Sequence, residues 1–138
     1  MSERVDKVSV ARRMMAVHNE DPHVLLERFE EFFHPECEWV PVIVGGLEGN
    51  KYRGKEGFRR WYAERNDALD EARVDIESCE EVREDVVLLL GRSLARGRAS
   101  GARVNEEVGV VFRFRDGLIW HDQAFASHRD ARVAVASA

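Results

Sequence analysis

Long hydrophobic runs are missing from this chain of 138 residues. A helix that crosses a bilayer needs about 18 or more consecutive apolar residues, and no stretch approaches that length. Residues 1–6 have neither the apolar core of a secretory signal nor the arginine-rich character of a transit peptide. We therefore expect a cytoplasmic protein that has no membrane partner.

Cysteine is almost absent, since the chain has only Cys37 and Cys79, which lie far apart. There is no C-x-x-C motif and no group of histidines near either cysteine. This excludes a disulfide framework and gives no support for a zinc site. We expect two buried free thiols, and neither a metal nor another cofactor.

An excess of positive charge is missing too, because the formal net charge is −5. A protein that binds nucleic acid presents a basic face. Four arginines gather around one hairpin, Arg92, Arg96, Arg98 and Arg103, but no aromatic side chains alternate with them. We expect them to solvate a loop, and we predict no nucleic acid partner.

What the chain does contain is a series of amphipathic segments without a linker or repeat, which is typical of one domain over residues 1–138. A stripe of apolar residues at helical spacing predicts a helix over residues 2–18. His18 stands at its end, where we expect a surface cap.

Two further helices are predicted. Asp21 is a suitable N-cap and Pro22 a suitable first residue for the second helix. We expect this helix to end at Phe33, because the following His-Pro pair is unfavourable for helical backbone. The third helix covers about residues 55–72, and one of its faces carries Phe58, Trp61, Tyr62, Arg65 and Leu69.

Strand patterns fill the rest of the chain. Residues 38–44 and 74–82 alternate around β-branched side chains, and longer apolar segments follow at residues 86–96, 103–114 and 118–125. Glycine and aspartate separate these last three segments, which is the strongest hairpin signal in the chain. The expected order is ααβαββββ.

This order resembles the NTF2-like superfamily, in particular its SnoaL-like branch. The resemblance depends on GKEGFRRW at residues 54–61, VVFRFRDGLI at 110–119 and FASHRDA at 125–131. It implies an α+β cone in which a strongly curved antiparallel sheet wraps around three helices, with an apolar pocket at the open end. Members are commonly homodimers, and their activities range from isomerases and cyclases to binding modules without catalysis.

Side-chain alternation predicts which residues of segment 103–114 line this pocket. Arg113 and Arg115 belong in water, which directs Phe112, Val108 and Glu106 inward. A turn centred near Ala99 then places the preceding strand opposite this one. It pairs Arg92 with Glu106 and directs Leu88, Leu90 and Arg92 inward.

The register of the last strand depends on the turn before it. A three-residue turn at residues 115–117 directs Trp120 and Asp122 inward, whereas a two-residue turn directs His121 and Gln123 inward. The resemblance favours the three-residue turn, which we adopt.

The predicted pocket combines apolar walls with three charged groups. Two carboxylates, Glu106 and Asp122, together with the Arg92 guanidinium, could act as an acid and a base, because burial and a neighbouring cation shift carboxyl pKa values in opposite directions. The structural alternative is a buried Arg92–Glu106 ion pair without catalysis. The predicted substrate-binding wall consists of Trp39, Trp61, Tyr62, Leu88, Leu90, Val108, Phe112 and Trp120.

Comparison with the catalytic residues of characterised branches reduces the number of reactions that the resemblance implies. Leu94 and Ala124 stand where the limonene-epoxide-hydrolase type has aspartates, and Val110 stands where the ketosteroid-isomerase type has an acid. SnoaL-like polyketide cyclases resemble the chain most, since they use an acidic residue of the closing strands for an aldol step without a cofactor. Asp122 is the candidate for that residue.

We therefore expect a protein that binds an apolar small molecule, with possible cofactor-free aldol cyclisation or isomerisation of a carbonyl compound. Asp122 is the expected acid/base, Arg92 the group that stabilises an oxyanion, and Glu106 the group that orients Arg92. The alternative is a non-catalytic ligand-binding or dimerisation module. A homodimer interface is expected on the outer sheet face, at Val87, Leu89, Val111 and Ile119.

Overall fold

The computed structural model describes residues 6–43, 47–48 and 51–136. The helices are α1 (Lys7–Glu20), α2 (Pro22–Glu27), α3 (Phe29–Phe32), α4 (Gly54–Ala68) and α5 (His128–Ala136). The strands are β1 (Phe33–Val40), β2 (Val42–Ile43), β3 (Leu47–Glu48), β4 (Tyr52–Arg53), β5 (Leu69–Arg83), β6 (Val86–Gly97), β7 (Arg103–Arg115) and β8 (Leu118–Phe125).

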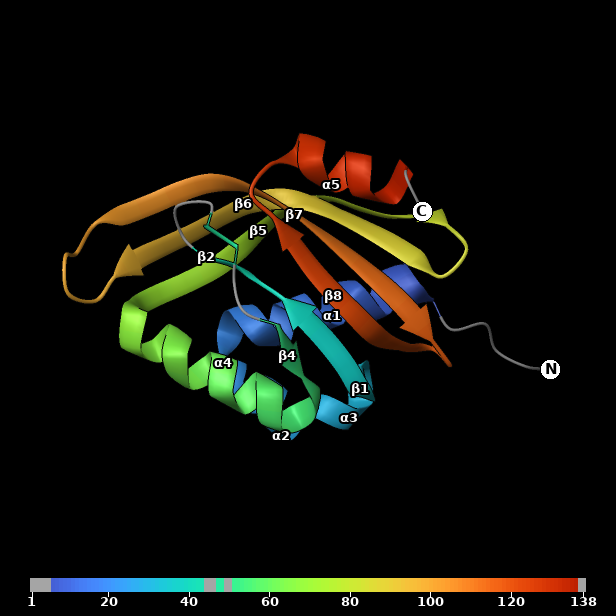
Figure 1. Cartoon of the computed structure of the whole chain (residues 1–138), viewed down its shortest axis with the longest axis horizontal. Coiled ribbons are helices and arrows are strands. Elements are labelled where there is room, and N and C mark those ends of the chain that lie inside the picture. The colour runs from blue at the N-terminus through green and yellow to red at the C-terminus, as the bar shows by residue number, and fades with distance from the viewer. Residues whose placement is uncertain (1–5, 44–46, 49–50, 137–138) are drawn as a thin grey trace.

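The main sheet has the strand order β4-β1-β8-β7-β6-β5, and β2 pairs separately with β3. The sheet curves without closing, with α1 and α4 on its concave side and α5 across its convex side (Figure 1). This confirms the α+β class and the strongly curved sheet. The sheet is mixed rather than wholly antiparallel, because β1 runs parallel to β8.

The first two helices begin at capping aspartates. Asp6 accepts a hydrogen bond from the Ser9 N–H at 3.1 Å, and Asp21 accepts one from the His23 N–H at 2.9 Å. Pro22 occupies the first turn of α2, where its missing N–H has no helical partner to lose. The predicted start of the second helix is therefore confirmed.

The ends of the predicted helices are less accurate. The second helix breaks at Arg28, which has φ −98° and ψ 20°, and β1 already begins at Phe33. Phe33 pairs with Ile119 of β8 and is buried in the core. The free energy gained from these contacts exceeds what one more helical turn would contribute. The third helix ends at Ala68, earlier than predicted, because Leu69 begins β5. Residue 44, the predicted end of the first strand, lies outside the described residues.

The predicted facing of β6 is wrong by one residue, because Ser93 rather than Arg92 lies opposite Glu106. The turn spans Gly97–Ala102 and is closed by a 2.9 Å hydrogen bond from its first N–H to its last carbonyl. Its centre therefore lies half a residue beyond Ala99. Since neighbouring residues of a strand point to opposite faces, this shift places every β6 side chain on the face opposite to the predicted one.

The homodimer surface predicted on the outer face is also wrong in its residues. Val87, Leu89 and Ile119 lie in the core, each with an exposed fraction of 0%. Val111 does face the convex side, but it packs in a cluster that α5 covers. This convex cluster consists of Val86, Leu88, Leu90, Val111 and Ala131. A homodimer remains a prediction, with a contact surface other than these four residues.

The last turn has two residues rather than three. Asp116 and Gly117 have φ values of 55° and 78°, as expected for a tight hairpin turn. Such a turn alone would direct Asp122 outward, but the register shifts again at Trp120, which has no partner on β7. This bulge reverses the alternation. Asp122 therefore pairs with Phe112 and returns to the concave face.

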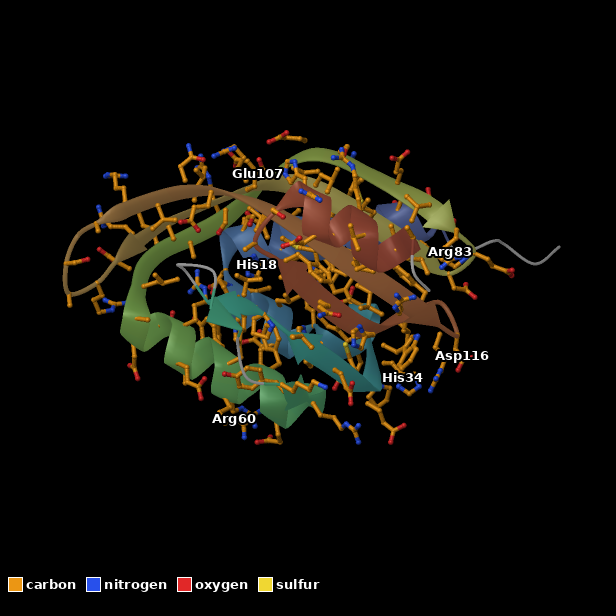
Figure 2. The ribbon with its side chains drawn as sticks, turned by 45° about the horizontal axis from the view of Figure 1, so that its top comes forward. His18, His34, Arg60, Arg83, Glu107 and Asp116 are labelled. Atoms are coloured by element: carbon orange, nitrogen blue, oxygen red, sulfur yellow. The ribbon has the colours of Figure 1, made fainter. Side chains whose placement is uncertain are left out.

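Side chains from the sheet hold both ends of α5. The Glu107 carboxylate accepts a hydrogen bond from the His128 N–H at 2.9 Å, and Arg83 donates to the Val135 carbonyl at 3.1 Å. An acid at the N-terminus and a base at the C-terminus complement the helix dipole. Glu107 and Arg83 lie toward opposite ends of this helix (Figure 2), which is thus fixed on the convex face.

We expect Gly109→Ala to loosen α5. A Cβ at Gly109 of β7 would lie 2.4 Å from the Cβ of Ala131, so the helix must move outward, at a cost of about 1–3 kcal/mol. Hydrogen exchange should show faster exchange of the amides at residues 128–136. Glycine at position 131 by itself weakens α5, so the control is Ala131→Gly alone. The double variant Gly109→Ala/Ala131→Gly lacks the clash between the two Cβ atoms and should exchange about as fast as that control. Unchanged exchange in Gly109→Ala would contradict the prediction.

Three further features concern the described part of the chain. None of its helices is both long enough and apolar enough to span a lipid bilayer. It holds no cluster of three or more His, Cys, Asp or Glu side chains placed to bind a metal ion. Cys37 and Cys79 are both buried and free.

Candidate functional site

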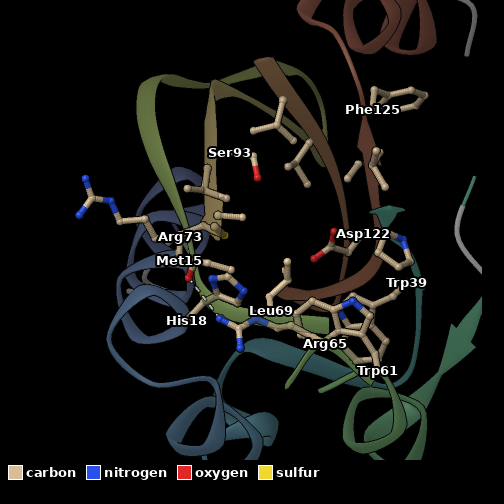
Figure 3. Close-up of a pocket in the computed structure, with 18 of the residues that line it drawn as sticks. Met15, His18, Trp39, Trp61, Arg65, Leu69, Arg73, Ser93, Asp122 and Phe125 are labelled. Carbon is tan, nitrogen blue, oxygen red and sulfur yellow. Dashed lines mark hydrogen bonds between the residues drawn. The ribbon is translucent and has the colours of Figure 1, made fainter. Parts of the chain in front are cut away.

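A cavity of about 610 Å³ lies between the concave face of the sheet and the helices α1 and α4 (Figure 3). Most of its wall is apolar, with Met14 and Met15 from α1 and Val108 and Val110 from β7. The polar residues that line it are His18, Tyr52, Glu64, Arg65, Arg73, Ser93, Glu106, Glu107 and Asp122. The cavity therefore combines hydrocarbon walls with a few ionisable groups.

Aromatic rings form one part of this wall. Trp39 of β1 lies 5.5 Å from Phe58 of α4, and Phe58 lies 5.4 Å from Trp61, between ring centroids. Trp61 in turn stacks on the His18 ring at 6.0 Å with an interplanar angle of 28°. Such a run of flat apolar surfaces is suited to contact with a ring-containing ligand.

Asp122 lies on the concave face, and its side chain points into the cavity (Figure 3). Its backbone is held between Trp39 of β1 and Phe112 of β7. No described residue donates a hydrogen bond to its carboxyl group. Burial raises the pKa of this carboxyl from 3.8 to about 7. Near neutral pH the acid and the carboxylate are therefore both populated.

His18 and Arg65 lie together in another part of the wall (Figure 3). Arg65 donates hydrogen bonds to the Ala72 carbonyl at 3.2 Å and to Asn66 Oδ1 at 3.0 Å. Burial lowers the pKa of His18 to about 4, and the Arg65 charge adds to this effect. The imidazole is therefore neutral at physiological pH beside a charged guanidinium.

Several of the predicted pocket residues do lie at the cavity. Its lining includes Trp39, Trp61, Val108, Glu106 and Asp122, although Glu106 is exposed on the far part of β7. Two others lie behind the wall rather than in it. Phe112 is fully buried in the core, and Tyr62 packs on the core with its ring 6.3 Å from the His23 ring.

The other predicted residues lie away from the cavity. Arg92 faces the convex side and donates to the Asn105 carbonyl at 3.0 Å, so the cluster of Arg92, Glu106 and Asp122 does not form. Trp120 stands in the bulge, with the Arg115 guanidinium 4.1 Å from its ring centroid. Leu88 and Leu90 belong to the convex cluster. The shifted register of β6 explains the positions of Arg92, Leu88 and Leu90, and the bulge in β8 explains the position of Trp120.

The sequence interpretation missed His18, Arg65 and Ser93 as cavity residues. Arg65 had a signal, because it shares a helical face with Phe58 and Trp61, and a cation on an apolar face points to a polar function there. His18 lies one turn after Met14, which faces the core. Ser93 had no signal, since its facing depends on the turn after β6.

Comparisons with known proteins agree with this fold. No curated protein matches the chain. TerC, co-crystallised with polyporic acid, is similar in structure with a TM-score of 0.73, 20% identity and 95% of each chain covered. An NTF2-like protein of Burkholderia pseudomallei has a TM-score of 0.73 and 17% identity over 100% of each chain.

A candidate SnoaL-like polyketide cyclase of a Jannaschia species is also similar, with a TM-score of 0.68 and 13% identity over 100% of this chain and 99% of that one. At these identities the structural likeness shows the fold alone. The sequence model of the SnoaL-like domain matches residues 10–122, which is most of the chain. The chain therefore belongs to the SnoaL-like domain family.

Proposed function

We propose that this protein binds an apolar, ring-containing carbonyl compound in the cavity and transfers a proton with Asp122. The cavity volume of about 610 Å³ falls within the roughly 300–1,000 Å³ of small-molecule sites. The aromatic wall at Trp39 and Trp61 supports a flat apolar ligand. The structurally similar TerC was co-crystallised with polyporic acid, which is consistent with a small organic ligand for this fold.

The observation that carries the proposal is the Asp122 carboxyl in its apolar surroundings. A general base works best when its pKa lies near the working pH, and burial raises the pKa of Asp122 to about 7. The carboxylate takes a proton from the carbon next to the ligand's carbonyl, and the C–H electron pair becomes the enolate. In an isomerisation the resulting acid gives the proton to another carbon of the enolate system. In an aldol step the enolate carbon attacks a second carbonyl, and the acid gives the proton to the alkoxide oxygen that forms, so neither reaction needs a cofactor.

Deuterium exchange tests this proposal without knowledge of the natural substrate. We expect the protein to exchange the acidic C–H protons of 2-tetralone, a bicyclic ketone, in D₂O at neutral pH. Asp122→Asn should reduce this exchange about 10²–10⁴-fold, the usual contribution of a general base. Mass spectrometry of the recovered ketone measures the rate.

Asp130→Asn is the matched control, because Asp130 is exposed on α5 and does not line the cavity. It should leave exchange unchanged. Equal exchange by the wild type and Asp122→Asn would refute the role of Asp122. Binding of the ketone without any exchange would favour the second candidate function, a ligand-binding module, which the largely apolar wall also supports.

A further inference from the structure

Arg65 is a cation that the cavity does not neutralise. Its side chain is half-buried in the wall, and its two hydrogen bonds go to neutral oxygens, the Ala72 carbonyl and Asn66 Oδ1. No described carboxylate forms an ion pair with it, and the charge of Asp21 acts on it only at longer range. A guanidinium has five N–H groups. Several donors therefore remain for a ligand.

Asp122 does not serve as the counter-ion of Arg65. The hydrogen-bond partners of Arg65 among the described residues are the Ala72 carbonyl and Asn66 Oδ1, and no ion pair joins its side chain to that of Asp122. Asp122 of β8 and Arg65 of α4 lie in different parts of the cavity wall (Figure 3). A charge taken out of water without a partner is unfavourable, and an anionic ligand group would offset this cost.

The hydrogen bonds of His18 define which of its nitrogens can contact a ligand. Asn19 donates to the Val74 carbonyl at 2.8 Å and accepts from the Val74 N–H at 2.9 Å, so the orientation of its amide is fixed. Asn19 Oδ1 lies 3.3 Å from His18 Nδ1, which must then carry the proton. In the neutral ring, Nε2 is left as an acceptor, and the His18 ring lies close to Arg65 in the cavity wall (Figure 3).

We infer that Arg65 and His18 form a subsite for the acidic end of the ligand. A delocalised oxyanion, such as a carboxylate or the enolate of a 1,3-dicarbonyl, accepts hydrogen bonds from Arg65. A hydroxyl next to it donates to His18 Nε2. The ring system of the ligand lies along Trp61, which stacks on His18. This inference rests on the proposed function and specifies its substrate class as an apolar acid.

Calorimetric titration with two matched compounds tests the subsite. 2-Naphthoate and 2-naphthamide have the same rings, but only the first is anionic. We expect the wild type to bind the naphthoate at least about 10-fold more tightly than the amide, as charge-assisted hydrogen bonds do. Arg65→Met should abolish this preference and leave the affinity for the amide within about 2-fold.

Two further variants make the result specific. Arg59→Met removes an exposed charge from the same helix and should keep the preference. Arg65→Gln can still donate to the Ala72 carbonyl, so it replaces Arg65→Met if that variant does not fold, and it should also lose the preference. Equal loss in the Arg59 and Arg65 variants would reveal a general charge effect and overturn the subsite.

The outcomes separate the two proposals. If the wild type binds both compounds equally, the acidic subsite is wrong, while an apolar ligand in the cavity still stands. If neither compound binds the wild type, both the subsite and the proposed apolar-ligand site are wrong. A preference for the naphthoate that disappears only in the Arg65 variants supports both.

Discussion

Asp122→Asn is expected to stabilise the protein at pH 8.5 and to have almost no effect on stability at pH 4. The pKa of the Asp122 carboxyl is 3.8 in an ordinary environment and about 7 in the fold. At roughly 1.4 kcal/mol per pH unit, this difference corresponds to at most about 4 kcal/mol. Asp122 is only partly shielded from solvent, which screens part of the charge, so we expect about 2–4 kcal/mol.

The direction follows from proton binding. Between pH 4 and 7 the folded state holds the Asp122 proton more tightly than the unfolded state, so the free energy of unfolding falls as the pH rises. Above pH 7 both states are ionised, and the penalty is complete and constant. Asparagine has a similar shape and no charge, so the variant avoids the penalty.

Urea denaturation at pH 4, 5.5, 7 and 8.5 measures this difference. Carboxyls whose pKa is lowered by hydrogen bonds, such as Glu31 and Glu38, contribute the opposite trend at acid pH. They are present in both proteins, so their contribution cancels in the difference. A stability difference that does not change with pH would show that Asp122 has an ordinary pKa.

The result bears on whether Asp122 is structural. An ion-paired aspartate would stabilise the fold in its charged form, and its removal would be destabilising. A carboxyl whose ionisation destabilises the fold does not hold that fold together. The expected gain in stability, combined with loss of deuterium exchange, is the result typical of a residue used for chemistry.

Gly91→Ala is expected to give the largest loss of stability. Gly91 of β6 pairs with Ile76 of β5, next to a register shift in β5 between Ile76 and Ser78. A Cβ at Gly91 would lie 2.1 Å from the carbonyl oxygen of Asp75. That atom belongs to the backbone and cannot rotate away. The strands must separate at the point where the bulge bends the sheet.

We expect a cost of about 3 kcal/mol or more, which corresponds to a fall in Tm of roughly 10 °C for a chain of this size. Thermal unfolding followed by circular dichroism measures it. Gly101→Ala is the control, because nothing lies within 4 Å of its Cβ position. Only its left-handed backbone, with φ +70°, opposes that change, at about 1 kcal/mol. Equal shifts in the two variants would contradict the predicted clash.

The sequence alone supported the class of fold and the strand segments of the C-terminal half. The predicted segment 118–125 coincides with β8, and 86–96 and 103–114 each end one residue before β6 and β7 do. The face of β7 was also predictable, because Arg113 and Arg115 flank a phenylalanine and cannot enter an apolar core. These features depend on residues close together in the chain.

The position of Asp122 illustrates the limit of such arguments. The sequence interpretation placed it on the inner face through a three-residue turn. The structure reaches the same face through a two-residue turn and a bulge at Trp120. The shorter turn and the bulge each shift the register of β8 by one residue, and the two shifts cancel. The register of β6 is shifted only once, so Arg92 lies on the convex face.

The sequence by itself determined the class of fold, the capped start of the second helix and the strand segments of the C-terminal half, which follow from interactions between near neighbours. Only the tertiary structure decided which side chains share the cavity, because each added residue in a turn or bulge reverses the faces of a strand. It also brought His18 of α1 next to Arg65 of α4 (Figure 3). No local pattern specifies that contact, since it depends on how two distant helices pack against one curved sheet.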